Sequence, residues 1–275
     1  MLRSAKLLIL AFLIGAAVMA TDAPAQTTIA PGTGELSAAL PTITLKVFTY
    51  RPASCTPRRL LLVFHGVGRD AGPYRDRAQP LADRACAIAI VPEFDSERFP
   101  SSQYQRGGSS VGLVASLVAW ARTAAGQPDM PYLLIGHSAG AQFLSRVAAY
   151  GPTAASRIVI ANPSTWVLPS TSTATPYGFG GTPNAEQAMR AYLALPIVVL
   201  LGGADTGSRN LSVNKEAMAQ GPNRLTRGHN TFQMAQSVAQ KHGWPLGWTL
   251  VEIPGVGHDA ARMFSAPQTA AALGQ

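Results

Sequence analysis

A Gly-His-Ser-Ala-Gly pentapeptide at residues 136–140 directly follows an apolar run at 132–135, and this combination constrains the fold more than any other feature of the chain. The run predicts a buried strand, and the G-x-S-x-G spacing is typical of a sharp strand-to-helix turn that exposes a serine hydroxyl. Such a turn crowds the backbone on both sides of Ser138, so side chains at Gly136 and Gly140 would clash. Ordinary glycine-rich turns share the spacing, so the rest of the chain decides its meaning.

Two later apolar runs each lead into a glycine-containing loop with one ionisable side chain. The run at 196–201 is followed by Gly-Gly-Ala and then Asp205, and the run at 248–253 is followed by a Pro/Gly loop that contains His258. Continuous aliphatic runs are typical of strands buried in parallel sheets, and reactive groups gather at the carboxyl ends of such strands. The three strands therefore bring a hydroxyl, a carboxylate and an imidazole to one edge of the predicted sheet.

These three residue types can form an acyl-transfer site. A serine hydroxyl is a weak nucleophile at its own pKa, so His258 is expected to accept its proton during attack and to return it to the leaving group. The carboxylate of Asp205 is expected to orient the His258 ring and to stabilise its protonated form. The sequence therefore predicts an acyl-enzyme intermediate on Ser138.

An earlier predicted strand supplies a further part of this site. The apolar run at 60–64 is followed by His65 and Gly66, the form of a loop that contributes one amide to an oxyanion hole. We expect the two donors to be the N–H groups of Val67 and Ala139, and Ala139 also begins a helix whose dipole favours negative charge. His65 itself is expected to support the loop rather than to transfer protons.

The strand-His-Gly loop, the G-H-S-A-G turn, the G-G-A-D strand end and the G-x-G-H loop together resemble the α/β-hydrolase superfamily, over about residues 40–275. Within it the chain is similar to secreted bacterial esterases of the polyhydroxybutyrate depolymerase and feruloyl esterase type. The resemblance implies a mainly parallel central sheet with helices on both faces, a short cap loop, and hydrolysis of a small or polymeric carboxylic ester. A peptidase or acyltransferase with the same three residues, or a noncatalytic binding protein on this fold, remains open.

The periodic segments between the runs predict the crossover helices. They lie at residues 109–125, 139–150, 185–193, 230–242 and 259–273. Strands that alternate with helices in this way favour a mainly parallel sheet.

The substrate pocket is expected to include aromatic and polar side chains near these loops. We expect Tyr74 beyond the oxyanion loop, His137 within the serine turn and Trp166 after the apolar run at 157–161 to contribute to it. Each of them has an alternative role, because aromatic residues in loops often pack locally, and His137 can instead pack or act as the base.

The first residues have the three regions of a secretory signal peptide. Arg3 and Lys6 precede an apolar run at 7–19, and small residues follow it, so residues 1–25 are expected to be removed. The run is shorter than the roughly 20 residues of a membrane-spanning helix, although an uncleaved anchor is the alternative. We expect an exported protein, periplasmic or secreted, without stable membrane insertion. A single α/β domain is expected at 26–275, with a loop-rich cap or substrate segment at about 162–195.

Cys55 and Cys86 each precede a predicted strand, so neighbouring strand starts can bring them together. Export favours a disulfide between them, and two buried thiols are the alternative.

The formal charge of +8 comes from scattered arginines rather than a basic stripe, so no nucleic-acid partner is expected. No motif implies a metal or an organic cofactor, and the oligomeric state is open.

Overall fold

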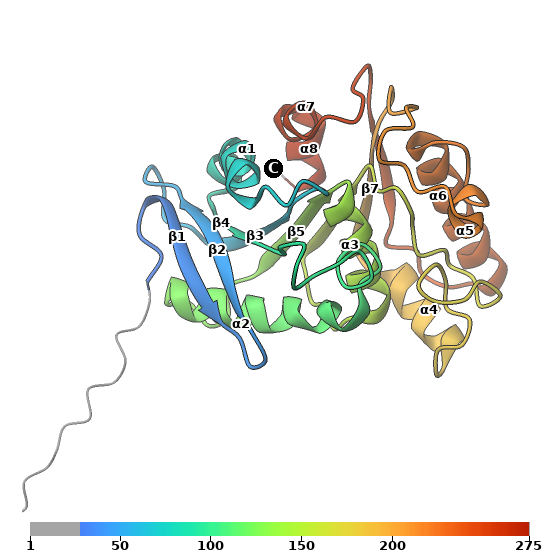
Figure 1. Cartoon of the computed structure of the whole chain (residues 1–275), viewed down its shortest axis with the longest axis horizontal. Coiled ribbons are helices and arrows are strands. Elements are labelled where there is room, and N and C mark those ends of the chain that lie inside the picture. Colours follow the sequence, from blue (N-terminus) through green and yellow to red (C-terminus); the bar gives the residue numbers. More distant parts are fainter. Residues whose placement is uncertain (1–27, 275) are drawn as a thin grey trace, which may run out of the picture.

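The computed structural model describes residues 28–274, and the expected signal peptide at 1–25 lies outside them. This part of the chain forms an eight-stranded sheet in the order β1-β2-β4-β3-β5-β6-β7-β8 (Figure 1). β1 pairs with β2, and β2 with β4, in antiparallel register, whereas all other neighbouring strands are parallel. The strands are β1 (Gly32–Ala39), β2 (Thr44–Arg51), β3 (Arg59–Phe64), β4 (Ala87–Pro92), β5 (Tyr132–His137), β6 (Arg157–Ala161), β7 (Ile197–Gly202) and β8 (Thr249–Ile253). The predicted mainly parallel sheet is confirmed.

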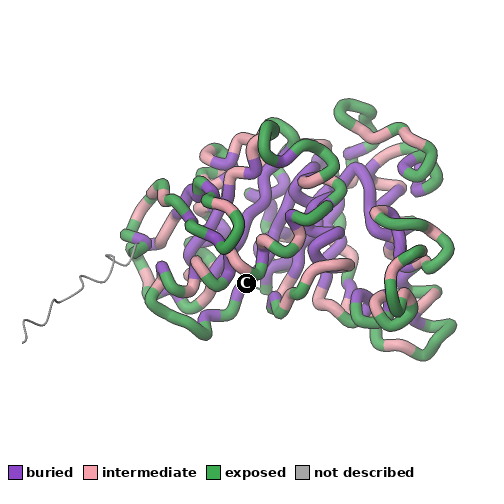
Figure 2. The backbone as a smooth tube through the Cα atoms, turned by 60° about the horizontal axis from the view of Figure 1, so that its bottom comes forward, coloured by how far each residue is buried: buried purple, intermediate pink, exposed green. Residues whose placement is uncertain are grey.

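Helices cover both faces of this sheet, because its inner strands present apolar side chains to both sides. Alternate residues of β3 belong to different cores: Leu60 and Leu62 pack on one face, and Leu61 and Val63 pack on the other. Figure 2 shows the central strands buried along their length. The helices are α1 (Ala71–Ala85), the 3-10 helix η1 (Gly108–Gly112), α2 (Leu113–Ala125), α3 (Ala139–Tyr150), α4 (Ala185–Ala194), α5 (Lys215–Met218), α6 (Arg224–His242), α7 (Ala260–Ser265) and α8 (Pro267–Ala272). Residues of α1, α7 and α8 join one core, and residues of α2, α3, α4 and α6 join the other.

Several predicted helix boundaries need correction. The helix predicted at 230–242 begins earlier, at Arg224, where the Asn223 side chain accepts a hydrogen bond from the Thr226 N–H. The helix predicted at 259–273 is two helices, because Pro267 forces an extended Ala266 between them. The sequence patterns did not predict β1, β2 or α1.

The segment expected to form a cap, residues 162–195, consists of irregular turns followed by α4. It packs against α3: the Tyr150 hydroxyl donates to the Gly178 carbonyl at 2.6 Å, and the rings of Tyr150 and Phe179 meet edge to face. None of its residues lines the pocket that contains Ser138. The apolar side chains of this segment extend the core instead.

Cys55 and Cys86 form the expected disulfide. It lies at the amino ends of the parallel strands β3 and β4, where Arg59 is in register with Ala87. Within residues 28–274, the helices are all too short or too polar to cross a lipid bilayer.

Candidate active site

The turn between β5 and α3 holds Ser138 in a strained backbone conformation, with φ 58° and ψ −114°. L-residues rarely adopt this conformation, and a strained turn of this kind presents the side chain at the top of the sheet. The two glycines make the turn possible. A Cβ at Gly136 would lie 2.5 Å from the Gly140 carbonyl oxygen, and a Cβ at Gly140 would collide with the Phe64 carbonyl. The crowding inferred from the G-x-S-x-G spacing is therefore present.

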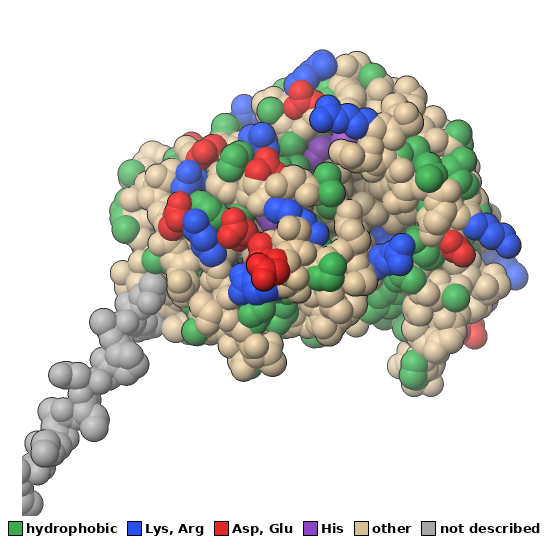
Figure 3. Space-filling model, in the orientation of Figure 1, with side chains coloured by type: hydrophobic (Ala, Val, Ile, Leu, Met, Phe, Trp, Pro, Cys, Tyr) green, Lys and Arg blue, Asp and Glu red, His purple; other side chains and the backbone are tan. Residues whose placement is uncertain are grey.

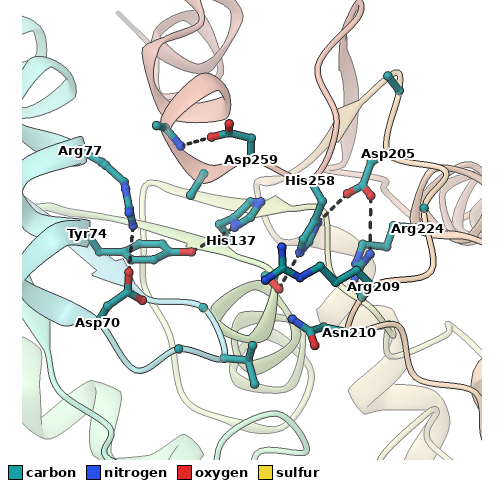
Figure 4. A pocket seen from close by; sticks show the side chains of 18 residues that line it. Asp70, Tyr74, Arg77, His137, Asp205, Arg209, Asn210, Arg224, His258 and Asp259 are labelled. Carbon is teal, nitrogen blue, oxygen red and sulfur yellow. Dashed lines mark hydrogen bonds and ion pairs between the residues drawn. The ribbon is translucent and has the colours of Figure 1, made fainter.

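Three side chains from three strand ends form a continuous hydrogen-bonded series (Figure 4). The Ser138 Oγ lies 2.9 Å from the His258 Nε2, and the His258 Nδ1 lies 2.7 Å from the Asp205 Oδ2. Because a carboxylate only accepts, the His258 Nδ1 carries a proton and Nε2 is free to accept one from the serine hydroxyl. Asp205 is 1% exposed, whereas the His258 side chain is 24% exposed and faces the pocket. The geometry suits proton transfer between Ser138 and His258.

A buried arginine lies behind Asp205. The Arg224 Nη1 is 3.6 Å from the Asp205 Oδ1, and both side chains are 1% exposed. The Arg224 Nη2 also donates to the Arg209 carbonyl at 2.8 Å. Burial lowers the pKa of the Arg224 guanidinium, and the neighbouring Asp205 opposes that shift. No sequence motif pointed to Arg224, although Asn223 marks the start of its helix.

Of the two expected oxyanion donors, Val67 belongs to the lining of this pocket, and Ala139 directly follows Ser138 in the chain. The Val67 N–H donates no hydrogen bond within residues 28–274. Ala139 is the first residue of α3, so its N–H has no acceptor one turn earlier in the helix. A backbone N–H without a protein acceptor can bind an oxyanion.

His65 supports this loop from beneath, as expected. Its Nε2 accepts from the Phe94 N–H at 3.0 Å, so its Nδ1 carries the proton that it donates to the Gly66 carbonyl, also at 3.0 Å. Burial lowers the pKa of His65 to about 4, so the ring is neutral near pH 7. The Tyr104 hydroxyl donates to the His65 carbonyl at 2.8 Å and fixes the loop further.

Tyr74 and His137 form a buried pair on the same side of the pocket. The Tyr74 hydroxyl lies 3.1 Å from the His137 Nδ1, and the His137 ring packs on the His258 ring with centroids 4.7 Å apart. Burial is the main cause that lowers the pKa of His137 well below its usual value, and His258 lowers it further. Burial also raises the pKa of Tyr74, which therefore keeps its proton. Both residues line the pocket.

Trp166 lies elsewhere, so the expectation that it contributes to the pocket is corrected. Its side chain is fully buried in the core, and it does not line the pocket. Its backbone N–H donates to the Gln220 side chain at 2.8 Å, and its carbonyl accepts from the same amide at 3.1 Å. The ring anchors the loop after β6 rather than contacting a ligand.

The pocket has a volume of about 760 Å³, enough for a small ester or part of a polymer. Its lining comes from the loops after β3, β5, β7 and β8, together with residues of α1 and of the α7 region. Figure 3 shows histidine side chains within a hollow that has lysine or arginine side chains at its edge. Among the described residues, no three His, Cys, Asp or Glu side chains are grouped so that they could hold a metal ion.

No protein-family model and no curated protein matches the chain. Solved structures do match it. A Pyrobaculum calidifontis esterase aligns with a TM-score of 0.56 at 15% identity, over 88% of this chain and 84% of that one. At this identity the likeness concerns the fold alone. Fold and site together define the class: an α/β-hydrolase.

Two other solved structures are more similar. One, described as poly(aspartic acid) hydrolase-1 from Sphingomonas sp. KT-1, aligns with a TM-score of 0.82 at 30% identity, over 90% of this chain and all of that one. The other, described as LpqC, a poly(3-hydroxybutyrate) depolymerase from Bordetella parapertussis, aligns with a TM-score of 0.79 at 29% identity, over 89% and 94% of the two chains. The chain belongs to the α/β-hydrolase superfamily, and its expected resemblance to the depolymerase type is confirmed.

Proposed function

We propose that this protein is a serine esterase, which hydrolyses carboxylic esters through an acyl-enzyme on Ser138. The observation that carries the proposal is the series Ser138–His258–Asp205, with hydrogen-bond distances of 2.9 and 2.7 Å at the end of a strained turn. An ordinary surface serine does not require a strained backbone, and it does not require a histidine that is hydrogen-bonded to a buried carboxylate. Both features are those of an activated nucleophile.

The mechanism follows from the roles of these groups. The Ser138 Oγ attacks the ester carbonyl carbon while His258 Nε2 takes the hydroxyl proton, and Asp205 stabilises the imidazolium that forms. The N–H groups of Val67 and Ala139 bind the developing oxyanion. The intermediate then collapses, the bond to the alcohol oxygen breaks, and His258 donates its proton to that oxygen. Water, deprotonated by His258, attacks the acyl-enzyme in the same way and releases the acid.

A polymeric ester is the more specific candidate substrate. The support is the similarity to a hydrolase described as acting on poly(3-hydroxybutyrate), which is a polyester. The second neighbour is described as acting on poly(aspartic acid), a polyamide, and so supports a polymeric substrate but not the ester bond. The open pocket also lacks a lid from residues 162–195, so a chain could pass over Ser138. Peptidase and acyltransferase activity use the same three residues and differ in the acceptor or the bond cleaved.

Export is the second part of the proposal. It is supported by the disulfide between Cys55 and Cys86, a bond that persists in oxidising compartments. The leader features at residues 1–25 point the same way. Mass spectrometry of the protein recovered from the periplasm and from the culture medium would give its compartment and its first residue.

Burst kinetics with p-nitrophenyl esters of increasing acyl length would test the activity. The wild-type protein is expected to release one equivalent of p-nitrophenol rapidly, and Ser138→Ala to give no burst. Ser237→Ala is a matched control, because this serine is exposed on α6 and donates only to the Gln233 carbonyl. Equal rates for wild type and Ser138→Ala would remove Ser138 as the nucleophile and favour a noncatalytic binding protein.

A further inference from the structure

The charged side chains of the pocket are not all committed to structural partners. Its carboxylates are all engaged: Asp70 pairs with Arg77 at 3.1 Å, and Asp205 holds His258 and Arg224. The third, Asp259, caps α7 by accepting from two backbone N–H groups at 2.9 and 3.1 Å. The pocket therefore has no free carboxylate among the described residues that line it.

Its arginines differ from one another. Arg77 is paired with Asp70, and Arg224 is buried against Asp205. Arg209 is exposed, and within residues 28–274 its guanidinium has neither an acidic partner nor a hydrogen-bond acceptor. Figure 4 shows its side chain extended across the pocket, on the side of His258. Among the described residues that line the pocket, Arg209 is therefore the arginine whose side chain has no partner.

The backbone around Arg209 is fixed, although its side chain is free. Its carbonyl accepts from the buried Arg224 at 2.8 Å. Further along, the Leu211 N–H donates to the Ser208 carbonyl at 3.1 Å, and the Ser212 N–H donates to the Ser164 Oγ at 2.7 Å. These bonds fix the point from which the side chain leaves the loop, so the guanidinium stays at the pocket while it retains rotational freedom.

We propose that Arg209 is a specificity residue that binds a carboxylate of the substrate, so that the enzyme favours esters with a negative charge near the scissile carbonyl. A guanidinium offers paired donors that match a carboxylate, and the pocket presents no free acid of its own to compete for it. A neutral ester would leave Arg209 in water and gain nothing from it. This inference rests on the proposed esterase function of the same site.

The test compares matched substrates. On the acyl side, the pair is mono-p-nitrophenyl glutarate and p-nitrophenyl pentanoate, which have equal chain lengths. On the alcohol side, the pair is para-carboxyphenyl butyrate and para-carbamoylphenyl butyrate. For at least one pair, Arg209→Gln is expected to lower the ratio of anionic to neutral kcat/KM by about tenfold, the effect of one partly exposed charge-assisted contact. The pair that responds locates the carboxylate.

Two further variants and a change in salt concentration test whether the charge of Arg209 sets the ratio of anionic to neutral kcat/KM. Arg209→Lys is expected to retain part of the ratio, because it keeps the charge without the fork geometry. Arg190→Gln is the control, since Arg190 is exposed on α4 and lies away from the Ser138 pocket. Added salt should reduce the wild-type ratio by screening. An unchanged ratio in Arg209→Gln, or an equal loss for anionic and neutral esters, would overturn the proposal.

Failure of the specificity proposal and failure of the esterase proposal are distinguishable. If wild type turns over the neutral esters with a burst, the esterase function stands whatever Arg209 does. If no ester is cleaved and Ser138 takes up no serine-directed fluorophosphonate, both proposals fall together.

Discussion

The two sides of the pocket around Ser138 hold their buried polar groups in opposite ways. On the side built from the loops after β3 and β5 and from α1, the side chains of His65, Tyr74 and His137 are buried and neutral, each with a hydrogen-bond partner. On the side built after β7, Asp205 and Arg224 are buried as a charged pair. The first side positions backbone amides, and the second holds charge behind His258.

This difference has a physical reason. During the proposed reaction His258 becomes positively charged, and a second cation in contact with it would oppose that change. His137 packs on the His258 ring, and its lowered pKa keeps it neutral. The charge that favours the imidazolium comes from Asp205, on the other side. The two sides are therefore expected to respond differently to substitution.

Removing the charge from the second side should have the largest effect. Asp205→Asn is expected to lower kcat by about 10⁴, because the amide favours the wrong tautomer of His258 and no longer stabilises its cation. Steady-state kinetics with a p-nitrophenyl ester would measure the loss. Asp76→Asn, an exposed carboxylate on α1, is the control and should leave kcat unchanged. A loss below tenfold in Asp205→Asn would show that another group orients His258.

The next largest effect is expected for Arg224. Arg224→Met leaves the buried Asp205 Oδ1 without its cation, and breaking a buried pair on one side costs about 3–5 kcal/mol of the free energy of unfolding. Urea unfolding would measure the loss of stability, and kcat should fall at the same time. Arg224→Lys keeps the charge and should retain part of both. Unchanged stability in Arg224→Met would mean that water replaces the guanidinium.

The neutral side should respond to pH. The folded-state pKa of His65, about 4, lies below its unfolded value, so the unfolded state binds more protons between the two. The free energy of unfolding should therefore fall as the pH drops from about 6.5 to 4, by up to about 3 kcal/mol from this residue. Urea unfolding across that range would measure it. His65→Asn should be less stable at pH 7 and have a shallower slope, and an identical slope in both proteins would contradict the assignment.

The smallest effect is expected for Tyr74. Tyr74→Phe removes the hydroxyl that bonds the His137 Nδ1 but keeps the ring, so the free energy of unfolding should fall by about 1 kcal/mol. Any fall in kcat should stay below about tenfold, since the bond acts on His258 only through the His137 ring. A larger fall in kcat with unchanged stability would instead indicate that the hydroxyl touches the substrate.

The strand ends of the site could be predicted from the sequence because two of them follow continuous apolar runs, and the third follows a mixed run, 248–253, that still has the composition of a strand. The sheet brings those ends together. Ser138, Asp205 and His258 were found in this way. Arg224 was not, because its role depends on where α6 begins relative to β7, and no local pattern encodes that distance. Asn223, the N-cap of that helix, is a local signal that could have moved the predicted start from residue 230 to Arg224.

Trp166 is the opposite case, a residue that the sequence analysis expected in the pocket and that the structure places in the core. An aromatic residue after a strand end can reach either a pocket or the core, and the local sequence does not distinguish the two placements. The surrounding structure decides between them: the Gln220 side chain bonds both backbone groups of Trp166, and the ring is buried in the core that also contains residues of α3 and α4. The strands β1 and β2 escaped prediction for a related reason, because they are partly exposed and lack the continuous apolar runs of the inner strands.

The disulfide also has a practical consequence. It joins the amino ends of β3 and β4, whereas the oxyanion loop and Ser138 follow the carboxyl ends of β3 and β5. A six-residue strand separates these two edges by about 20 Å. An enzyme attached to a solid support through the cross-linked edge would keep its reactive face towards the solution, where a large or insoluble substrate could reach it.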